Sequence, residues 1–137
     1  MLKYVVTYLG AAVVFAGVDV VWLSVLSARV YRPTLDPVLA DKVNLLPAVI
    51  FYLAYLAGML VLVIAPAGRA GSLRQAAING AVLGAMAYAT YDLTNQATLK
   101  VWSTAITAAD IGWGTFLTGA GCSAGYLVWR WAQMRFG

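Results

Sequence analysis

Acidic and amide side chains gather in one stretch of an otherwise apolar chain, residues 88–100, which contains Asp92, Thr94, Asn95 and Gln96. Carboxylate, hydroxyl and amide oxygens can hold a proton, a hard cation or a polar ligand. An unpaired polar group is costly away from water, so partners must stabilise this cluster. The stretch therefore predicts a polar site within apolar surroundings.

Two further aspartates lie in or beside apolar segments, and both begin the word Asp-x-x-Trp. The two words are Asp19-Val-Val-Trp22 and Asp110-Ile-Gly-Trp113. The segments around them also align at a leucine and at two hydroxyl positions. The first and last helices of a four-pass chain run antiparallel, so this echo indicates either an inverted repeat or a chance similarity between apolar segments.

Asp19 is the most deeply placed of these carboxylates. A charged carboxylate costs about 2.5–3.5 kcal/mol on membrane-insertion scales, so Asp19 should face the interior of a helix bundle. There we expect it to be protonated, or to accept hydrogen bonds from Asn95, Thr94 or a tyrosine. It would then serve either as part of a ligand site or as a link between helices.

The other residues also have structural explanations. Asp110 fits the N-terminal turn of a helix, where the helix dipole favours negative charge. Asp92 fits an interfacial residue that contacts water or pairs with Lys100. Trp22 and Trp113 fit packing or interface positions. With these alternatives open, the candidate binding residues are Asp19, Trp22, Tyr91, Asp92, Thr94, Asn95, Asp110 and Trp113.

The composition places the chain in a lipid bilayer. Of 137 residues, 63% are hydrophobic and 10% are charged, whereas soluble domains contain about 25% charged residues. Nine Lys and Arg face five acidic residues, for a net charge of +4. The basic residues are scattered singly, which argues against binding to nucleic acid and suits an anionic membrane surface.

The residue types also limit the ligand chemistry. The chain has a single cysteine, Cys122, and no histidine. An internal disulfide and most zinc, haem and transition-metal ligand sets are thereby excluded. We expect no cofactor and no resident metal, and only protons or hard, oxygen-preferring cations fit the remaining side chains.

The apolar segments predict an all-α integral membrane protein, with residues 1–137 forming one transmembrane domain. Four helices are expected in an antiparallel bundle, at about residues 2–28, 45–64, 73–97 and 108–131, with a short interfacial helix at about 37–44.

Local signals set the expected helix ends. Pro33 should break the first helix, and Pro37 should open the interfacial one. Pro66 should close the second helix. Ser72 opens a capping box for the third helix, and Thr107 opens a similar word for the fourth.

Helix geometry then brings the aspartates together. At 1.5 Å per residue, Asp19 lies about 24 Å along its helix from Lys3, and Asp92 lies about 28 Å along its helix from Leu73. Asp110 is near the start of the helix that returns from the same side. All three should therefore meet near the face opposite the chain termini.

Small residues predict where helices pack closely. Gly80 and Gly84 form a GxxxG word in the third helix, and Gly121 and Gly125 form another in the fourth. Besides the lipid bilayer, a second copy of the chain is the expected partner, through one of these two faces.

The distribution of positive charge gives the orientation. The termini and the connection between the second and third helices carry five basic residues, whereas the opposite side carries four, namely Arg29, Arg32, Lys42 and Lys100. The positive-inside rule then predicts cytoplasmic N and C termini.

Three words of the chain are Asp19-Val-Val-Trp-Leu23, Tyr91-Asp-Leu-Thr-Asn-Gln-Ala-Thr98 and Asp110-Ile-Gly-Trp-Gly114. Together they resemble the signature of an uncharacterised family of small bacterial membrane proteins, domain of unknown function 2177. The resemblance covers essentially the whole chain. It implies a four-helix protein of the bacterial inner membrane, and it implies no activity, ligand or catalytic residue.

Three functions fit these residues. In the first, the Asp/Asn/Thr cluster near the non-cytoplasmic face binds a proton, a cation or a small polar ligand, for binding or transport. In the second, the chain is a structural or assembly subunit of a membrane complex. A lipid-modifying enzyme with paired carboxylates has less support, because no nucleophile–base pair, histidine or phosphate-binding loop occurs.

Overall fold

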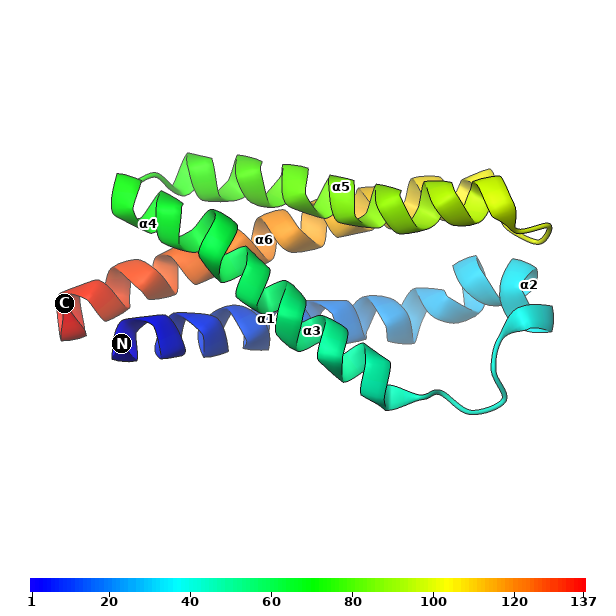
Figure 1. The fold of residues 1–137 in the computed structure, drawn as a ribbon, viewed down its shortest axis with the longest axis horizontal. Coiled ribbons are helices and arrows are strands. Elements are labelled where there is room, and N and C mark those ends of the chain that lie inside the picture. Colours follow the sequence, from blue (N-terminus) through cyan, green and yellow to red (C-terminus); the bar gives the residue numbers. More distant parts are fainter.

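The chain folds entirely into helices and short connections, as its composition predicts. The computed structural model describes residues 1–137, and its helical segments join into four long rods (Figure 1). The first comprises α1 (Leu2–Leu26), the π-helical turn η1 (Ser27–Tyr31), α2 (Arg32–Leu35) and the 3₁₀ turn η2 (Asp36–Val38). The second comprises α3 (Leu45–Met59), the π-helical turn η3 (Leu60–Ile64) and α4 (Ala65–Ala70). The third is α5 (Leu73–Thr98) and the fourth is α6 (Thr104–Phe136).

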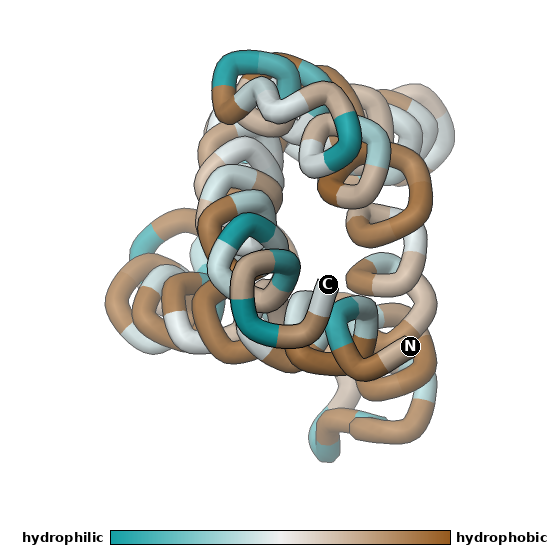
Figure 2. The backbone as a smooth tube through the Cα atoms, turned by 90° about the vertical axis from the view of Figure 1, so that its left-hand side faces the viewer, coloured by the Kyte–Doolittle hydropathy of each residue, from teal (hydrophilic) through white to brown (hydrophobic).

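Length and polarity fit a membrane-spanning bundle. Two rods, Leu2–Val38 and Leu45–Ala70, are long and apolar enough to cross a bilayer. Large apolar side chains cover the outside, and Val13 and Met134 are 72% and 79% exposed. Such an apolar exterior suits contact with lipid. Figure 2, which faces the end carrying both termini, shows hydrophilic segments gathered at the α4–α5 turn and near the C-terminus.

The most extensive helix contact joins α5 to α6, and glycines make it possible. A Cβ atom on Gly80 would lie 2.7 Å from the Cβ of Cys122, and one on Gly84 would overlap the carbonyl oxygen of Gly114. The predicted close-packing face is therefore filled inside the chain. The same holds for Gly121 and Gly125, which pack against α1 and the second rod. A homo-oligomer remains a prediction, and these two faces are already occupied.

The apolar core lies between α1, the second rod and α6. Its fully buried side chains include Phe15, Met59, Ile64, Leu117 and Trp129. Toward the end opposite the termini, α3 crosses α1 and diverges from α5 (Figure 1). The Tyr8 hydroxyl of α1 donates to the Leu53 carbonyl of α3 at 3.0 Å, which holds α3 across α1.

The first connection differs from the prediction. The helix expected at residues 37–44 is absent, because the helical path from α1 continues to Val38 and residues 39–44 are not helical. Pro33 does not end the first rod. The π-helical turn precedes it and places it in the first turn of α2, where its missing N–H group is tolerated.

The second rod extends to Ala70 rather than ending near residue 64. Here too a π-helical turn precedes the proline, so Pro66 occupies the first turn of α4. Gly71 ends the rod in the left-handed conformation, with φ of 66°. The Ser72 cap is confirmed, because its hydroxyl accepts the Gln75 N–H at 3.1 Å.

The last helix starts earlier than predicted. Ser103 is its N-cap, and the serine hydroxyl accepts the Ile106 N–H at 3.3 Å. The word that begins at Thr107 is therefore not the cap. Asp110 consequently lies in the second turn of α6, so its explanation as an N-terminal residue is wrong.

Candidate functional site

The three aspartates predicted to meet lie at the end opposite the termini, each on a different helix. Asp19 of α1, Asp92 of α5 and Asp110 of α6 are 6%, 0% and 8% exposed. A constant helical rise was sufficient to place them at similar depth. Their hydrogen-bond partners depend on helix rotation and were predicted only in part.

Asp19 joins three helices. The Tyr52 hydroxyl of α3 donates to its Oδ2, and the indole N–H of Trp113 on α6 donates to its Oδ1 at 3.0 Å. A tyrosine partner was expected, but Asn95 and Thr94 are not partners. Thr94 is exposed, and its hydroxyl donates to backbone carbonyls of its own helix. Such local bonds are common for threonine in helices.

Asp110 has a partner that the sequence did not indicate. The Tyr31 hydroxyl donates to Asp110 Oδ1, and the indole N–H of Trp22 donates to the Tyr31 hydroxyl oxygen at 3.0 Å. Tyr31 is the last residue of the π-helical turn η1. Because a π-helical turn shifts the angular position of the residues that follow, no regular periodicity places Tyr31 at this site.

The two Asp-x-x-Trp words exchange partners across the antiparallel pair α1 and α6. Trp113, from the second word, donates to Asp19 of the first. Trp22, from the first word, reaches Asp110 of the second through Tyr31. The two indoles stack on each other, with ring centroids 4.2 Å apart and planes 9° from parallel. This arrangement gives the sequence echo a physical role.

Asp92 is the least satisfied of the three. Its carboxyl oxygens are buried and accept no hydrogen bond from an N–H or hydroxyl group. The side chain beside it is another carboxyl, that of Asp110, with which Asp92 can form a hydrogen bond when the two acids share a proton. The alternative in which Asp92 pairs with Lys100 is wrong, because no basic side chain lies close to Asp92 or Asp110. Two acids thus lie side by side without a counter-charge from the chain.

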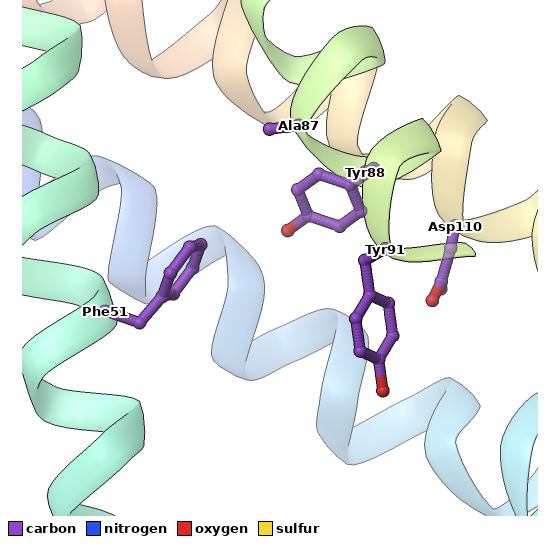
Figure 3. Close-up of a pocket in the computed structure, with 5 residues that line it drawn as sticks. All are labelled: Phe51, Ala87, Tyr88, Tyr91 and Asp110. Atoms are coloured by element: carbon purple, nitrogen blue, oxygen red, sulfur yellow. The ribbon is translucent and has the colours of Figure 1, made fainter. Parts of the chain in front are cut away.

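Aromatic side chains surround these acids and leave two adjoining cavities. The first, of about 380 Å³, lies between α3, α5 and α6 and is lined by Phe51, Ala87, Tyr88, Tyr91 and Asp110 (Figure 3). The second, of about 370 Å³, shares four of those five residues and extends toward Asp19. It is also lined by Trp22, Leu23, Tyr31, Leu35, Leu39, Tyr52, Trp102 and Trp113.

The remaining polar residues of the 88–100 stretch are at its edge. Asn95 lies beside the Tyr91 hydroxyl. Gln96 closes the α5–α6 hairpin, because its amide donates to Thr104 at 2.9 Å and accepts from Thr107 at 2.7 Å. Neither Thr94, Asn95 nor Gln96 lines either cavity. These side chains therefore support the end of the bundle.

The chain matches a known family of membrane proteins. The family described as "Predicted membrane protein (DUF2177)" matches residues 4–127, a range that contains all three aspartates and both stacked tryptophans. The chain belongs to this family. No curated protein and no solved structure matches it.

Within this DUF2177 chain, sequence reasoning missed five aromatic residues of the site, namely Tyr31, Phe51, Tyr52, Tyr88 and Trp102. Tyr88 alone gave a usable signal, because it is four residues before Asp92 on the same helix. Phe51 and Tyr52 lie in an apolar helix without charged residues, where aromatic side chains normally indicate packing.

Proposed function

We propose that this chain is a membrane-embedded binding protein for a small organic monocation, with an ammonium group as the recognised chemistry. The observation that carries the proposal is a group of three buried carboxyl groups without a basic partner, two of which, Asp19 and Asp110, line an aromatic cavity. Asp19 has two donors, Asp110 has one and Asp92 has none. The chain therefore compensates a charge on Asp19 best and a charge on Asp92 least.

The charge balance requires something positive in this region. A carboxylate inside a bilayer costs about 2.5–3.5 kcal/mol even on the more lenient scales. Two adjacent carboxylates add mutual repulsion, as expected for Asp92 and Asp110. Bound protons relieve this cost when the site is empty, and a bound cation relieves it when the site is occupied.

The cavity walls favour an organic cation over a bare metal ion. Aromatic rings bind ammonium groups through their negatively polarised faces, and the effect reaches about 2 kcal/mol when the pair is shielded from water. Tyr88 and Tyr91 supply such rings near Asp110, and Phe51 supplies another from across the cavity (Figure 3). Hard metal ions instead require several converging oxygen atoms, and no three acidic side chains here are placed to share one ion.

A second function has specific support. The bonds from Tyr52 and Trp113 to Asp19 tie α1, α3 and α6 together, which is the arrangement expected of a structural link. If the chain is an assembly subunit, this linking role explains why Asp19 is buried among the helices. It does not account for a buried Asp92 without any donor.

The test uses the full chain in lipid nanodiscs and follows its thermal unfolding midpoint, Tm. We expect tetramethylammonium chloride to raise Tm in a saturable way, because a ligand at 100 times its Kd stabilises the folded state by about 2.7 kcal/mol. Potassium chloride at equal ionic strength and the uncharged 2,2-dimethylpropan-1-ol should give no saturable rise.

Two variants assign the effect to the site. Asp110→Asn should abolish the rise, since it removes the carboxylate that lines both cavities. Asp36→Asn is the matched control, because Asp36 is an exposed carboxylate outside the cavities. Equal responses to the ammonium salt and to its neutral analogue would overturn the proposal.

A further inference from the structure

The cavity beside Asp110 opens sideways, between α3 and α5. Phe51 on α3 and Tyr91 on α5 stand on either side of the opening (Figure 3), and they are 50% and 59% exposed. In a membrane-spanning bundle this flank faces lipid, because the outer surface of the surrounding helices is apolar. A molecule at this opening is therefore in the bilayer.

The cavity wall that faces the end of the bundle opposite the chain termini is apolar. Leu35, Leu39 and Trp102 line the second cavity at that end, where Leu35 is buried and Leu39 is partly exposed. The indole N–H of Trp102 is held by the Thr107 hydroxyl at 3.0 Å, within the network that closes the α5–α6 hairpin. A cation that came from water at this end would pass an apolar wall, whereas one that came from the lipid would enter between α3 and α5.

The depth of the opening also indicates the bilayer. At 1.5 Å per residue, Phe51 lies about 9 Å from the start of α3, and Asp110 lies about 9 Å from the start of α6. Tyr91 lies about 10 Å from the end of α5. Half of a hydrocarbon core is about 15 Å thick, so the opening is level with the acyl chains of one leaflet.

We propose that the occupant is a cationic amphiphile that enters from this leaflet. Its ammonium head would lie between Asp110 and the ring of Tyr88, and its alkyl chain would leave past Phe51 and Tyr91 into the lipid. This inference rests on the proposed function and names the ligand class of the same site. A head group that also carried phosphate would be repelled by Asp110 and Asp92, so the ligand class is an alkylammonium without phosphate.

The test varies the alkyl chain and keeps the head group constant. Alkyltrimethylammonium chlorides with methyl, butyl, octyl and dodecyl chains are titrated onto the full chain in nanodiscs, and the rise in Tm gives the apparent Kd. If the alkyl chain of the bound ligand lies in the lipid, the apparent Kd falls by a factor of about four for each added methylene group. If the site holds the head group and leaves the chain no opening to the lipid, the apparent Kd shows no such gain.

One variant separates the chain from the head. Ala87 lines the cavity, so Ala87→Phe should reduce its volume, weaken binding of the octyl and dodecyl salts more than binding of tetramethylammonium, and thereby remove the gain with chain length. Ala97→Phe is the control, since Ala97 is an exposed alanine of the same helix. If Ala87→Phe does not fold, Ala87→Leu provides the same comparison.

The outcomes distinguish the two proposals. Binding that strengthens with chain length, and loses that gain in Ala87→Phe, supports an amphiphile. Tetramethylammonium binding with no gain for longer chains overturns the amphiphile and leaves the ammonium site intact. If none of the four salts binds, both the ammonium site and the amphiphile are overturned. A lysophospholipid with the same trimethylammonium head that binds as tightly as the matched alkylammonium overturns the exclusion of phosphate.

Discussion

The indole N–H of Trp113 on α6 donates to Asp19 Oδ1 on α1 at 3.0 Å, and this hydrogen bond joins the first helix of the chain to the last. The same indole stacks on that of Trp22. Hydrogen bond and ring stack thus fix the spacing and the rotation of α1 against α6 at the candidate site.

The Trp113 bond can be tested without losing the ring stack. Trp113→Phe keeps an aromatic ring but leaves Asp19 Oδ1 without a donor, so the variant should unfold with a free energy lower by about 1–3 kcal/mol. Trp131→Phe is the control, because Trp131 is 51% exposed and has no hydrogen bond to a carboxylate. Equal Tm values for the two variants would contradict the role of the indole N–H.

Asp19 itself is tested by two substitutions. Its carboxylate accepts from two donors, whereas an asparagine offers one oxygen and turns its NH₂ group toward the other donor. Asp19→Asn should therefore lose some stability. Asp19→Leu leaves both Tyr52 and Trp113 unsatisfied and should lose more, at about 1–3 kcal/mol for each donor. Chemical denaturation in detergent gives the order, and an Asp19→Leu variant as stable as wild type would show that Asp19 links nothing.

These partners show what the sequence could and could not predict. The constant rise of a helix places Asp19, Asp92 and Asp110 near one face, and polarity together with length predicts an all-helical membrane protein. The partners of each acid depend on rotation about the helix axis. A single π-helical turn changes that rotation, as it does before Tyr31.

Some helix ends could be predicted from the sequence and others could not. The cap at Ser72 was predicted because its hydroxyl satisfies a backbone N–H within its own turn. The role of Pro66 was mispredicted because a π-helical turn lies before it and lets the rod continue. Local chemistry was therefore readable from sequence, whereas changes of helical register set by tertiary packing were not.

Close helix packing gives a prediction with opposite signs at two glycines. A methyl group on Gly84 would overlap the Gly114 carbonyl of α6, whereas one on Gly58 would meet nothing within 4 Å. Gly84→Ala should destabilise the fold by about 1–3 kcal/mol through overpacking. Gly58→Ala should stabilise it by about 0.5–1 kcal/mol, because alanine loses less backbone entropy in a helix. A Gly84→Ala variant that melts like wild type would remove the proposed close contact.

The larger substitution extends this comparison. Gly84→Leu should destabilise the fold more than Leu83→Ala, because Leu83 is only partly buried and its truncation leaves α5 and α6 in contact. Melting of the two variants in detergent checks the order, and equal Tm values would contradict it.

Orientation follows from the basic residues at the end with the termini. Lys3 lies over the Trp129 ring at 4.4 Å from its centroid, an arrangement suited to a membrane interface. We expect this end to be cytoplasmic, as the positive-inside rule predicts. In intact cells, a membrane-impermeant maleimide should label Lys100→Cys and should not label Arg135→Cys.

The native thiol does not confuse this measurement. Cys122 is fully buried, so the unmodified chain should give no label and serves as the background. Labelling of Arg135→Cys from outside, with Lys100→Cys protected, would reverse the orientation.

Asp92 gives the sharpest separation of stability from binding. It is fully buried without a donor and lies beside the Asp110 carboxyl. Asp92→Asn keeps the shape, removes one charge and supplies an N–H group to its neighbour. The ligand-free variant should therefore have a higher Tm than wild type. It should also gain less stability from tetramethylammonium, because one counter-charge has been lost. Functional sites often sacrifice stability in this way.

The measurement is Tm with and without the ammonium salt, for wild type, Asp92→Asn and the exposed control Asp41→Asn. A ligand-free Asp92→Asn that is less stable than wild type would show that the carboxyl has a structural partner. Full retention of the ammonium response would place the cation away from the Asp92–Asp110 pair.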